Sequence, residues 1–277
     1  MQHLYSFAKS FFGIACLVLF LGTGAAFAQT RTADGIGLFG DGSDGDVTIT
    51  KSTFVTRDMY YNNLTIESGQ TFNPNGFRIF VSGTLTLNKG ARISRDGNDY
   101  GVDWGAALSA GTLGGSGAGG SIATSYEGSG GAVANSLGGS GGGVQDFHNG
   151  VASPPDVSVG GGGVFRSALQ ALSGRSLDGA VVNGGGGGGV GPYAGGGGGG
   201  GGVVVVAART VVVSGGATTI SANGGGSSSP YGGGGGGGVV VVITTTAQPA
   251  GLKLSASGGI GGYNCSPGAD GFTAWLN

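Results

Sequence analysis

Charged, histidine and cysteine side chains are scarce in this chain, and each shortage argues against a class of function. Only 9% of the 277 residues are charged, and the formal net charge is −2. Nucleic-acid binding needs clustered Lys and Arg, so this balance argues against nucleic acid as a partner. Two histidines and two cysteines are too few for a zinc site, and neither a P-loop nor a serine-nucleophile motif is present. We therefore expect a non-catalytic protein without a resident cofactor.

The first 28 residues have the pattern of a secretory signal. Lys9 precedes an apolar stretch at residues 11–21, and Ala26 and Ala28 form a small-residue cleavage site. The apolar stretch is shorter than the ~20 residues that span a bilayer. We expect a secreted protein, extracellular or at the cell surface, without a transmembrane segment after residue 28. Cys265 then remains without an intramolecular partner, and either lies buried or pairs between chains in a homo-oligomer.

Short alternating strands are predicted between residues 47 and 87, with no helical periodicity. Leu64, Ile66 and Phe72 recur 21 residues later as Leu85, Leu87 and Ile93, so apolar positions fall on apolar positions. This is the pattern of a parallel β-solenoid, in which each coil stacks its inward residues on the coil below.

The same template returns far downstream. Residues 85–94 resemble residues 211–221 with one residue inserted, and residues 221–225 reappear as 255–259. Four valines at 203–206 recur 36 residues later at 239–242. We expect a signal at 1–28, N-terminal coils at 29–104, a glycine-rich segment at 105–202 and valine/glycine coils at 203–277, with one solenoid resuming after the glycine-rich part.

Glycine supplies 70 residues, including the runs 195–202 and 232–238. Ordering a residue costs ~1–2 kcal/mol of backbone entropy, so such runs are ordered only when packed together. One packed form is the threefold polyglycine-II helix. The continuous valine blocks predict strands buried on both faces, and the adjacent glycine runs are the expected cover. The predicted fold is all-β, a parallel β-solenoid with a polyglycine-II-like layer. Flexible glycine tethers are the alternative.

Residues 105–270 resemble the polyglycine-II sandwich of certain phage tail-tip adhesins, and the whole chain resembles secreted glycine-rich β-helical proteins. The resemblance implies a rigid glycine platform whose loops contact a cell-surface glycan or protein. The secretory signal departs from a virion protein, so the resemblance implies a recognition platform and not a phage part.

Aromatic side chains near the ends of glycine segments are the candidate ligand-binding residues. Tyrosine combines broad apolar area with a hydroxyl group at low entropic cost. The alternative is a structural role, in which each ring covers the end of a coil or packs across a turn. The candidates are Tyr126, Phe147, His148, Tyr193, Tyr231 and Tyr263.

The acidic turn that contains Asp41, Asp44 and Asp46 is a candidate Ca²⁺ site, because Ca²⁺ prefers clustered carboxylate oxygens. A second acidic turn lies at residues 96–99. Asp-Gly is also the plainest turn dipeptide, so an ordinary turn is the alternative.

The function expected from these features is a surface adhesin or recognition scaffold. A self-assembling envelope or matrix protein is the main alternative. A β-helical enzyme acting on polysaccharides would use paired carboxylates from residues 41–103. An ice-binding protein would need a repeated threonine array, which the coils do not share.

Overall fold

The computed structural model describes residues 37–99, 105–119, 138–142, 183–189, 196–227, 231–263 and 265–277. The chain divides into two units, Met1–Gly37 and Leu38–Asn277, and the description below concerns the second. Its regular elements are all strands: β1 (Val47–Ile49), β2 (Thr53–Phe54), β3 (Met59–Tyr61), β4 (Leu64–Ile66), β5 (Thr71–Asn73), β6 (Ile79–Asn88), β7 (Arg92–Ser94), β8 (Val203–Ser214), β9 (Thr218–Ser221), β10 (Val239–Ile243), β11 (Leu252–Ser255) and β12 (Phe272–Leu276).

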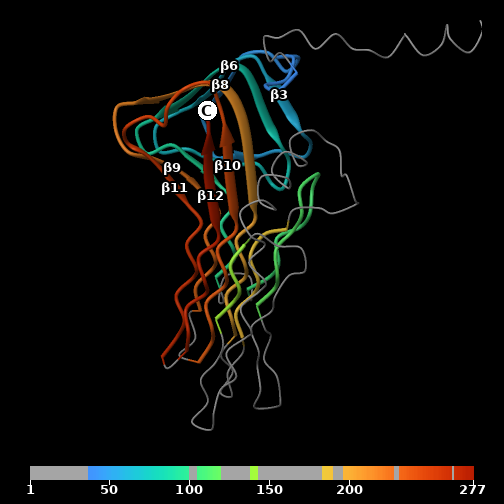
Figure 1. Cartoon of the computed structure of the whole chain (residues 1–277), viewed down its shortest axis with the longest axis vertical. Coiled ribbons are helices and arrows are strands. Elements are labelled where there is room, and N and C mark those ends of the chain that lie inside the picture. The colour runs from blue at the N-terminus through green and yellow to red at the C-terminus, as the bar shows by residue number, and fades with distance from the viewer. Residues whose placement is uncertain are drawn as a thin grey trace, which may run out of the picture. The chain divides into compact units, whose positions relative to one another are not determined.

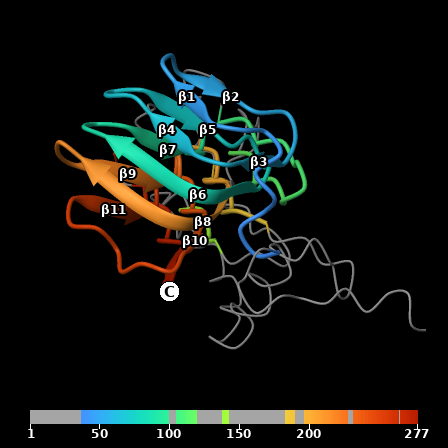
Figure 2. The same cartoon turned by 90° about the horizontal axis from the view of Figure 1, so that it is seen from above.

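The strands form two sheets, and the chain passes back and forth between them. The larger sheet has the order β1-β4-β6-β8-β10-β12, with β3 also paired to β6, and the smaller has the order β11-β9-β7-β5-β2. Every pairing is parallel. Figure 2 shows the strands stacked from β1 and β2 at one end to β10 and β11 at the other. The prediction of an all-β chain with parallel strands is confirmed for the described residues.

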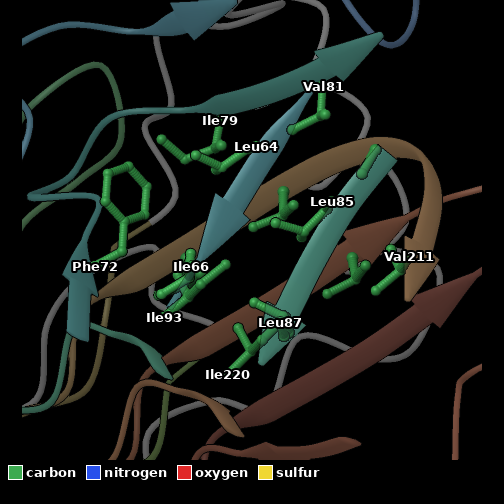
Figure 3. Close-up of a cluster of buried hydrophobic side chains, with 14 of the residues drawn as sticks. Leu64, Ile66, Phe72, Ile79, Val81, Leu85, Leu87, Ile93, Val211 and Ile220 are labelled. Atoms are coloured by element: carbon green, nitrogen blue, oxygen red, sulfur yellow. The ribbon is translucent and has the colours of Figure 1, made fainter. Parts of the chain in front are cut away.

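The 21-residue repeat is confirmed as strand register. Leu64 pairs with Leu85 and Ile66 with Leu87, while Phe72 pairs with Ile93 in the other sheet. These side chains are fully buried and meet in one cluster between the sheets, which Figure 3 shows. Stacking of like residues therefore forms the core, as the repeat predicted.

The downstream repeats are confirmed in the same way. Leu85 pairs with Val211 and Ile93 with Ile220, which places the one inserted residue between these two pairs. Val203 pairs with Val239, and Ser221 pairs with Ser255. Residues before 95 and after 202 thus belong to the same two sheets.

The valine blocks are buried on both faces, as predicted. Val204 and Val206 point into the cluster between the sheets, whereas Val203 and Val205 join a second cluster on the opposite face. That second cluster contains Phe39 and Leu113, which come from outside the sheet. These side chains contribute to the cover on the second face of the valine blocks.

The glycine segments continue from the strand ends and lie beside one another (Figure 1). We call this set the glycine bundle. Its described segments are residues 95–99, 105–119, 138–142, 183–189, 196–202, 221–227, 232–238, 255–263 and 265–271. Segments 221–227 and 255–263 leave the smaller sheet, whereas 196–202, 232–238 and 265–271 lead into the larger one. The bundle is therefore tied to both sheets along one side.

Candidate functional site

Hydrogen bonds from residues 233–238 repeat every third residue. Gly233 and Gly236 donate their N–H groups to segment 183–189, Gly234 and Gly237 donate to segment 265–271, and Gly235 and Gly238 donate to segment 221–227. A chain with three residues per turn presents its N–H groups in three directions, which accounts for this rotation.

Carbonyl groups of the same run accept bonds with the same period. Gly232 and Gly235 accept from segment 255–263, Gly233 and Gly236 accept from segment 196–202, and Gly234 and Gly237 accept from segment 138–142. The three donor directions and three acceptor directions lead to six different neighbours. Residues 232–238 thus lie inside the bundle with their backbone groups bonded on every side.

Close packing of these segments leaves no room for side chains. Every residue of 184–189, 196–202 and 232–238 is buried. A Cβ atom on any residue of 232–238 would overlap a backbone carbonyl oxygen of a neighbouring segment. At Gly232 it would also overlap the hydroxyl oxygen of Ser227. Glycine is therefore required at each of these positions by contact, and not by backbone flexibility.

The end of the bundle far from the sheets carries side chains again. We call this end the tip, and define it by Ser227, Tyr231, Ile260, Tyr263 and Cys265. Ser227 donates its N–H to the carbonyl of Ile260 at 2.9 Å, and Gly262 donates to Gly232 at 2.8 Å, so the two turns lie together. At ~3.1 Å per residue, the eight steps from Tyr231 to Val239 place Tyr231 roughly 25 Å from the start of β10.

Two side chains at the tip are among the most exposed apolar groups of the described residues. Ile260 is 77% exposed and Tyr263 is 71% exposed, whereas Tyr231 is half-buried. No charged residue occurs in the sequence from 254 to 269. The tip is therefore a partly apolar surface on a hydrogen-bonded backbone, with exposed Asp99 beside it, where it accepts a hydrogen bond from the N–H of Gly226 at 2.6 Å.

The structure brings together two of the six predicted aromatic-site residues, Tyr231 and Tyr263. Tyr126, Phe147, His148 and Tyr193 lie outside the described residues, as does the expected signal at 1–28. Ile260 was missed because only aromatic residues were considered. Its signal in the sequence is an isolated large apolar residue between two glycine pairs, in a stretch (255–262) where every other residue is glycine, alanine or serine.

The acidic turn closes the edge of a sheet. Asp44 accepts a hydrogen bond from the backbone N–H of Tyr60 at 2.7 Å, and its own N–H donates to the Tyr60 carbonyl. Asp46 accepts from the N–H of Asn63 at 3.1 Å. The Asp44 carboxylate therefore occupies a backbone N–H of β3 that faces away from β6, whereas Asp46, just before β1, bonds to the residue just before β4. Edge protection of this kind is a common use of charged side chains.

Each carboxylate of the acidic turn already has a protein partner. Hydrogen bonds from Arg57 hold the pKa of Asp44 below its ordinary value, and hydrogen bonds from Asn63 and Asn62 lower the pKa of Asp46. The backbone N–H of Ser43 lowers the pKa of Asp41. Among residues that the structure describes, no group of three or more His, Cys, Asp or Glu side chains is arranged to hold a metal ion.

Polar side chains attach segment 105–119 to the sheets. Asp58 forms an ion pair with Arg78 and accepts a hydrogen bond from the Thr112 hydroxyl at 2.5 Å. Arg95 is 2% exposed and donates to the Ser109 carbonyl and, at 2.9 Å, to Asn75. Burial lowers the pKa of Arg95 to about 10. These contacts fix the segment that supplies Leu113 to the second cluster.

No protein-family model, curated protein or solved structure matches this chain. In the described part of the chain, no helix has the length and apolar character needed to cross a membrane.

Proposed function

We propose that the protein is a secreted, non-catalytic recognition scaffold that binds a cell-surface glycan or protein through the tip. In this proposal the two sheets are the faces of a parallel β-solenoid and the glycine bundle is a polyglycine-II layer. The two sheets, in which consecutive strands mostly alternate, and the constant strand register support the solenoid. The threefold rotation of hydrogen bonds and the six neighbours of residues 232–238 support the polyglycine-II layer.

The observation that carries the proposal is the contrast between the buried bundle and its exposed end. A run of glycines is packed so closely that no side chain fits, yet it ends in Ile260 and Tyr263, which are largely exposed. A rigid support with apolar groups at its end fits recognition, because little entropy is lost when a pre-organised surface binds. Aromatic rings are well suited to such contacts.

Carboxylates in the region where a polysaccharide-acting enzyme would keep its acid and base have other roles. Asp44 and Asp46 bond to backbone groups of neighbouring strands, and Asp58 is paired with Arg78. Asp96 accepts hydrogen bonds from Ser94, Ser221 and Asn223. These contacts favour a scaffold over a catalyst for the described part of the chain.

Binding of the purified protein to intact cells and to an array of glycans and surface proteins tests the proposal. We expect Tyr263→Ala and Ile260→Ser each to weaken binding about tenfold or more, as truncation of a central apolar anchor does. Phe54→Ala is the matched control, because Phe54 is 63% exposed but lies in β2 of the smaller sheet. Unchanged binding by both tip variants, or release of reducing sugar ends by the wild type, would overturn the proposal.

A further inference from the structure

The outer edges of the two sheets are not equally protected. At the first end of the larger sheet, Asp44 and Asp46 bond to the backbone groups of Tyr60 and Asn63. The short strand β1 follows, and it has exposed Asp46 before it and exposed Lys51 after it. Charge and shortness are the usual ways in which proteins prevent pairing at an edge.

The opposite edge, β12, lacks these protections. It is five residues long and uncharged, whereas the edge strand β11 of the smaller sheet carries exposed Lys253. Phe272 donates its N–H to Gly238, and Leu276 accepts from Thr244, so the backbone groups of Phe272, Ala274 and Leu276 point toward β10. Because backbone groups alternate in direction along a strand, those of Thr273 and Trp275 point toward the free edge.

Side chains of β12 are also suited to further pairing. Phe272 and Leu276 are half-buried and pack against the second cluster, and Ala274 lies between them on the same face. The ring of Trp275 is held inward, because its Nε1 donates to the Thr246 carbonyl at 3.0 Å. Bulky side chains therefore do not obstruct the edge.

From this asymmetry we infer that the protein forms a two-fold dimer through β12. A filament would need two open ends, and the first end has only the three-residue strand β1, flanked by exposed Asp46 and Lys51, whereas a closed dimer needs only one self-complementary surface. A two-fold axis at Ala274 makes the two strands antiparallel. Thr273 then exchanges backbone hydrogen bonds with Trp275 of the second copy, and Phe272 lies beside Leu276 of the second copy.

The dimer would bury apolar surface that is half-exposed in the single chain. The cross-strand pair of Phe272 and Leu276 would extend the second cluster across the two-fold axis on both sides. Antiparallel pairing would also direct the two glycine bundles in opposite directions. The dimer would thus present its two tips on opposite sides.

Cysteine cross-linking at the axis tests this arrangement. In a non-hydrogen-bonded antiparallel pair the Cα atoms lie ~4.5 Å apart, and this is within the range of ~4.4–6.8 Å that a disulfide bridges. With Cys16 and Cys265 replaced by serine, we expect Ala274→Cys to give a disulfide-linked dimer under mild oxidation. Thr48→Cys, at the centre of β1, is the matched control and should remain monomeric on a non-reducing gel.

The mass of the protein in solution gives a second, independent test. Light scattering coupled to gel filtration should show two chains for the wild type and one chain for Thr273→Lys, which places a charge on the edge. Circular dichroism of Thr273→Lys should show an unchanged unfolding transition once dissociation is accounted for. A monomeric wild type, a filament under the electron microscope, or cross-linking of Thr48→Cys equal to that of Ala274→Cys would overturn the inference.

Discussion

Asn223 donates its backbone N–H to Oδ1 of Asp96 at 2.7 Å, although 127 residues separate them. The other carboxylate oxygen of Asp96 accepts from the hydroxyls of Ser94 and Ser221. After the next strand of the smaller sheet, β11, the N–H of Ser257 donates to Oδ1 of Asn223 at 2.9 Å. A series of side-chain oxygens therefore accepts backbone hydrogen bonds at the points where the chain leaves the smaller sheet and enters the glycine bundle.

Removal of the Asp96 carboxylate should destabilise the fold. We expect Asp96→Ala to lower the free energy of unfolding by about 1–3 kcal/mol, because it leaves the N–H of Asn223 without its acceptor. Urea denaturation followed by circular dichroism measures the loss. Asp96→Asn is the control, because it keeps an oxygen for Asn223 and should lose clearly less. Equal losses for the two variants would contradict this role.

Replacing glycine by alanine should destabilise the protein inside the bundle but not at its margin. A Cβ at position 236 would overlap the Gly139 carbonyl oxygen, whereas at position 226 its nearest neighbour is Oδ1 of Asp99 at 3.4 Å. We expect Gly236→Ala to destabilise the protein by about 1–3 kcal/mol or more, in the range of overpacked cores. Gly226→Ala should be nearly neutral. Melting temperatures of the two variants measure this difference, and we expect the lower value for Gly236→Ala. Equal values would mean that the bundle can expand to accommodate a Cβ atom.

Amide hydrogen exchange should be slow through the glycine runs. Each N–H group from Gly233 to Gly238 donates to a carbonyl of a neighbouring segment, and residues 233–238 are themselves buried, so exchange requires the bundle to open. We expect protection comparable to that of Val239–Ile243 in β10, and rapid exchange at the exposed turn residues Ala247 and Gln248. Fast exchange throughout 233–238 would favour flexible tethers over a packed layer.

Acid should weaken the fold through its paired carboxylates. Burial raises the pKa of Asp58, but hydrogen bonds from Arg78 and Thr112 outweigh it and bring the pKa below the ordinary 3.8. A carboxylate with a lowered folded pKa stabilises the protein above the unfolded pKa and loses that contribution as pH falls through the folded pKa. We expect the free energy of unfolding to drop below about pH 4, and Asp58→Asn to flatten that drop.

An acid series of urea titrations on both proteins measures this slope. At neutral pH, Asp58→Asn should itself cost about 1–2 kcal/mol, because the Arg78 guanidinium loses its anionic partner and bonds to a neutral amide oxygen instead. An identical pH dependence in the two proteins would mean that Asp58 does not contribute to acid unfolding.

Strand register was predictable because the core is built from stacked like residues. The repeats that relate Leu64 to Leu85 and Val203 to Val239 lie in the sequence itself, and the pairings follow them. The insertion of one residue between Val211 and Ile220 was equally visible. A position between the two sheets must be apolar in each strand, so strands that pair carry matching patterns.

The neighbours within the glycine bundle could not be predicted in this way. Segments without side chains carry no pattern that distinguishes one partner from another, so the bond from Gly236 to Gly186 has no counterpart in the sequence. The roles of Asp44 and Asp96 were missed for a related reason. An Asp-Gly turn looks alike whether its carboxylate binds metal, faces water or closes a strand edge.

The threefold rotation of hydrogen bonds imposes a rule on the lengths of the glycine segments. Adding one or two residues to a leg would turn every later N–H group toward the wrong neighbour, whereas adding three would restore the phase. The hairpin formed by residues 255–263 and 265–271 could therefore be lengthened by three residues in each leg, which would carry Tyr263 outward by roughly 9 Å. Insertions and deletions compatible with this architecture should come in multiples of three, which makes the reach of the chain adjustable in fixed steps.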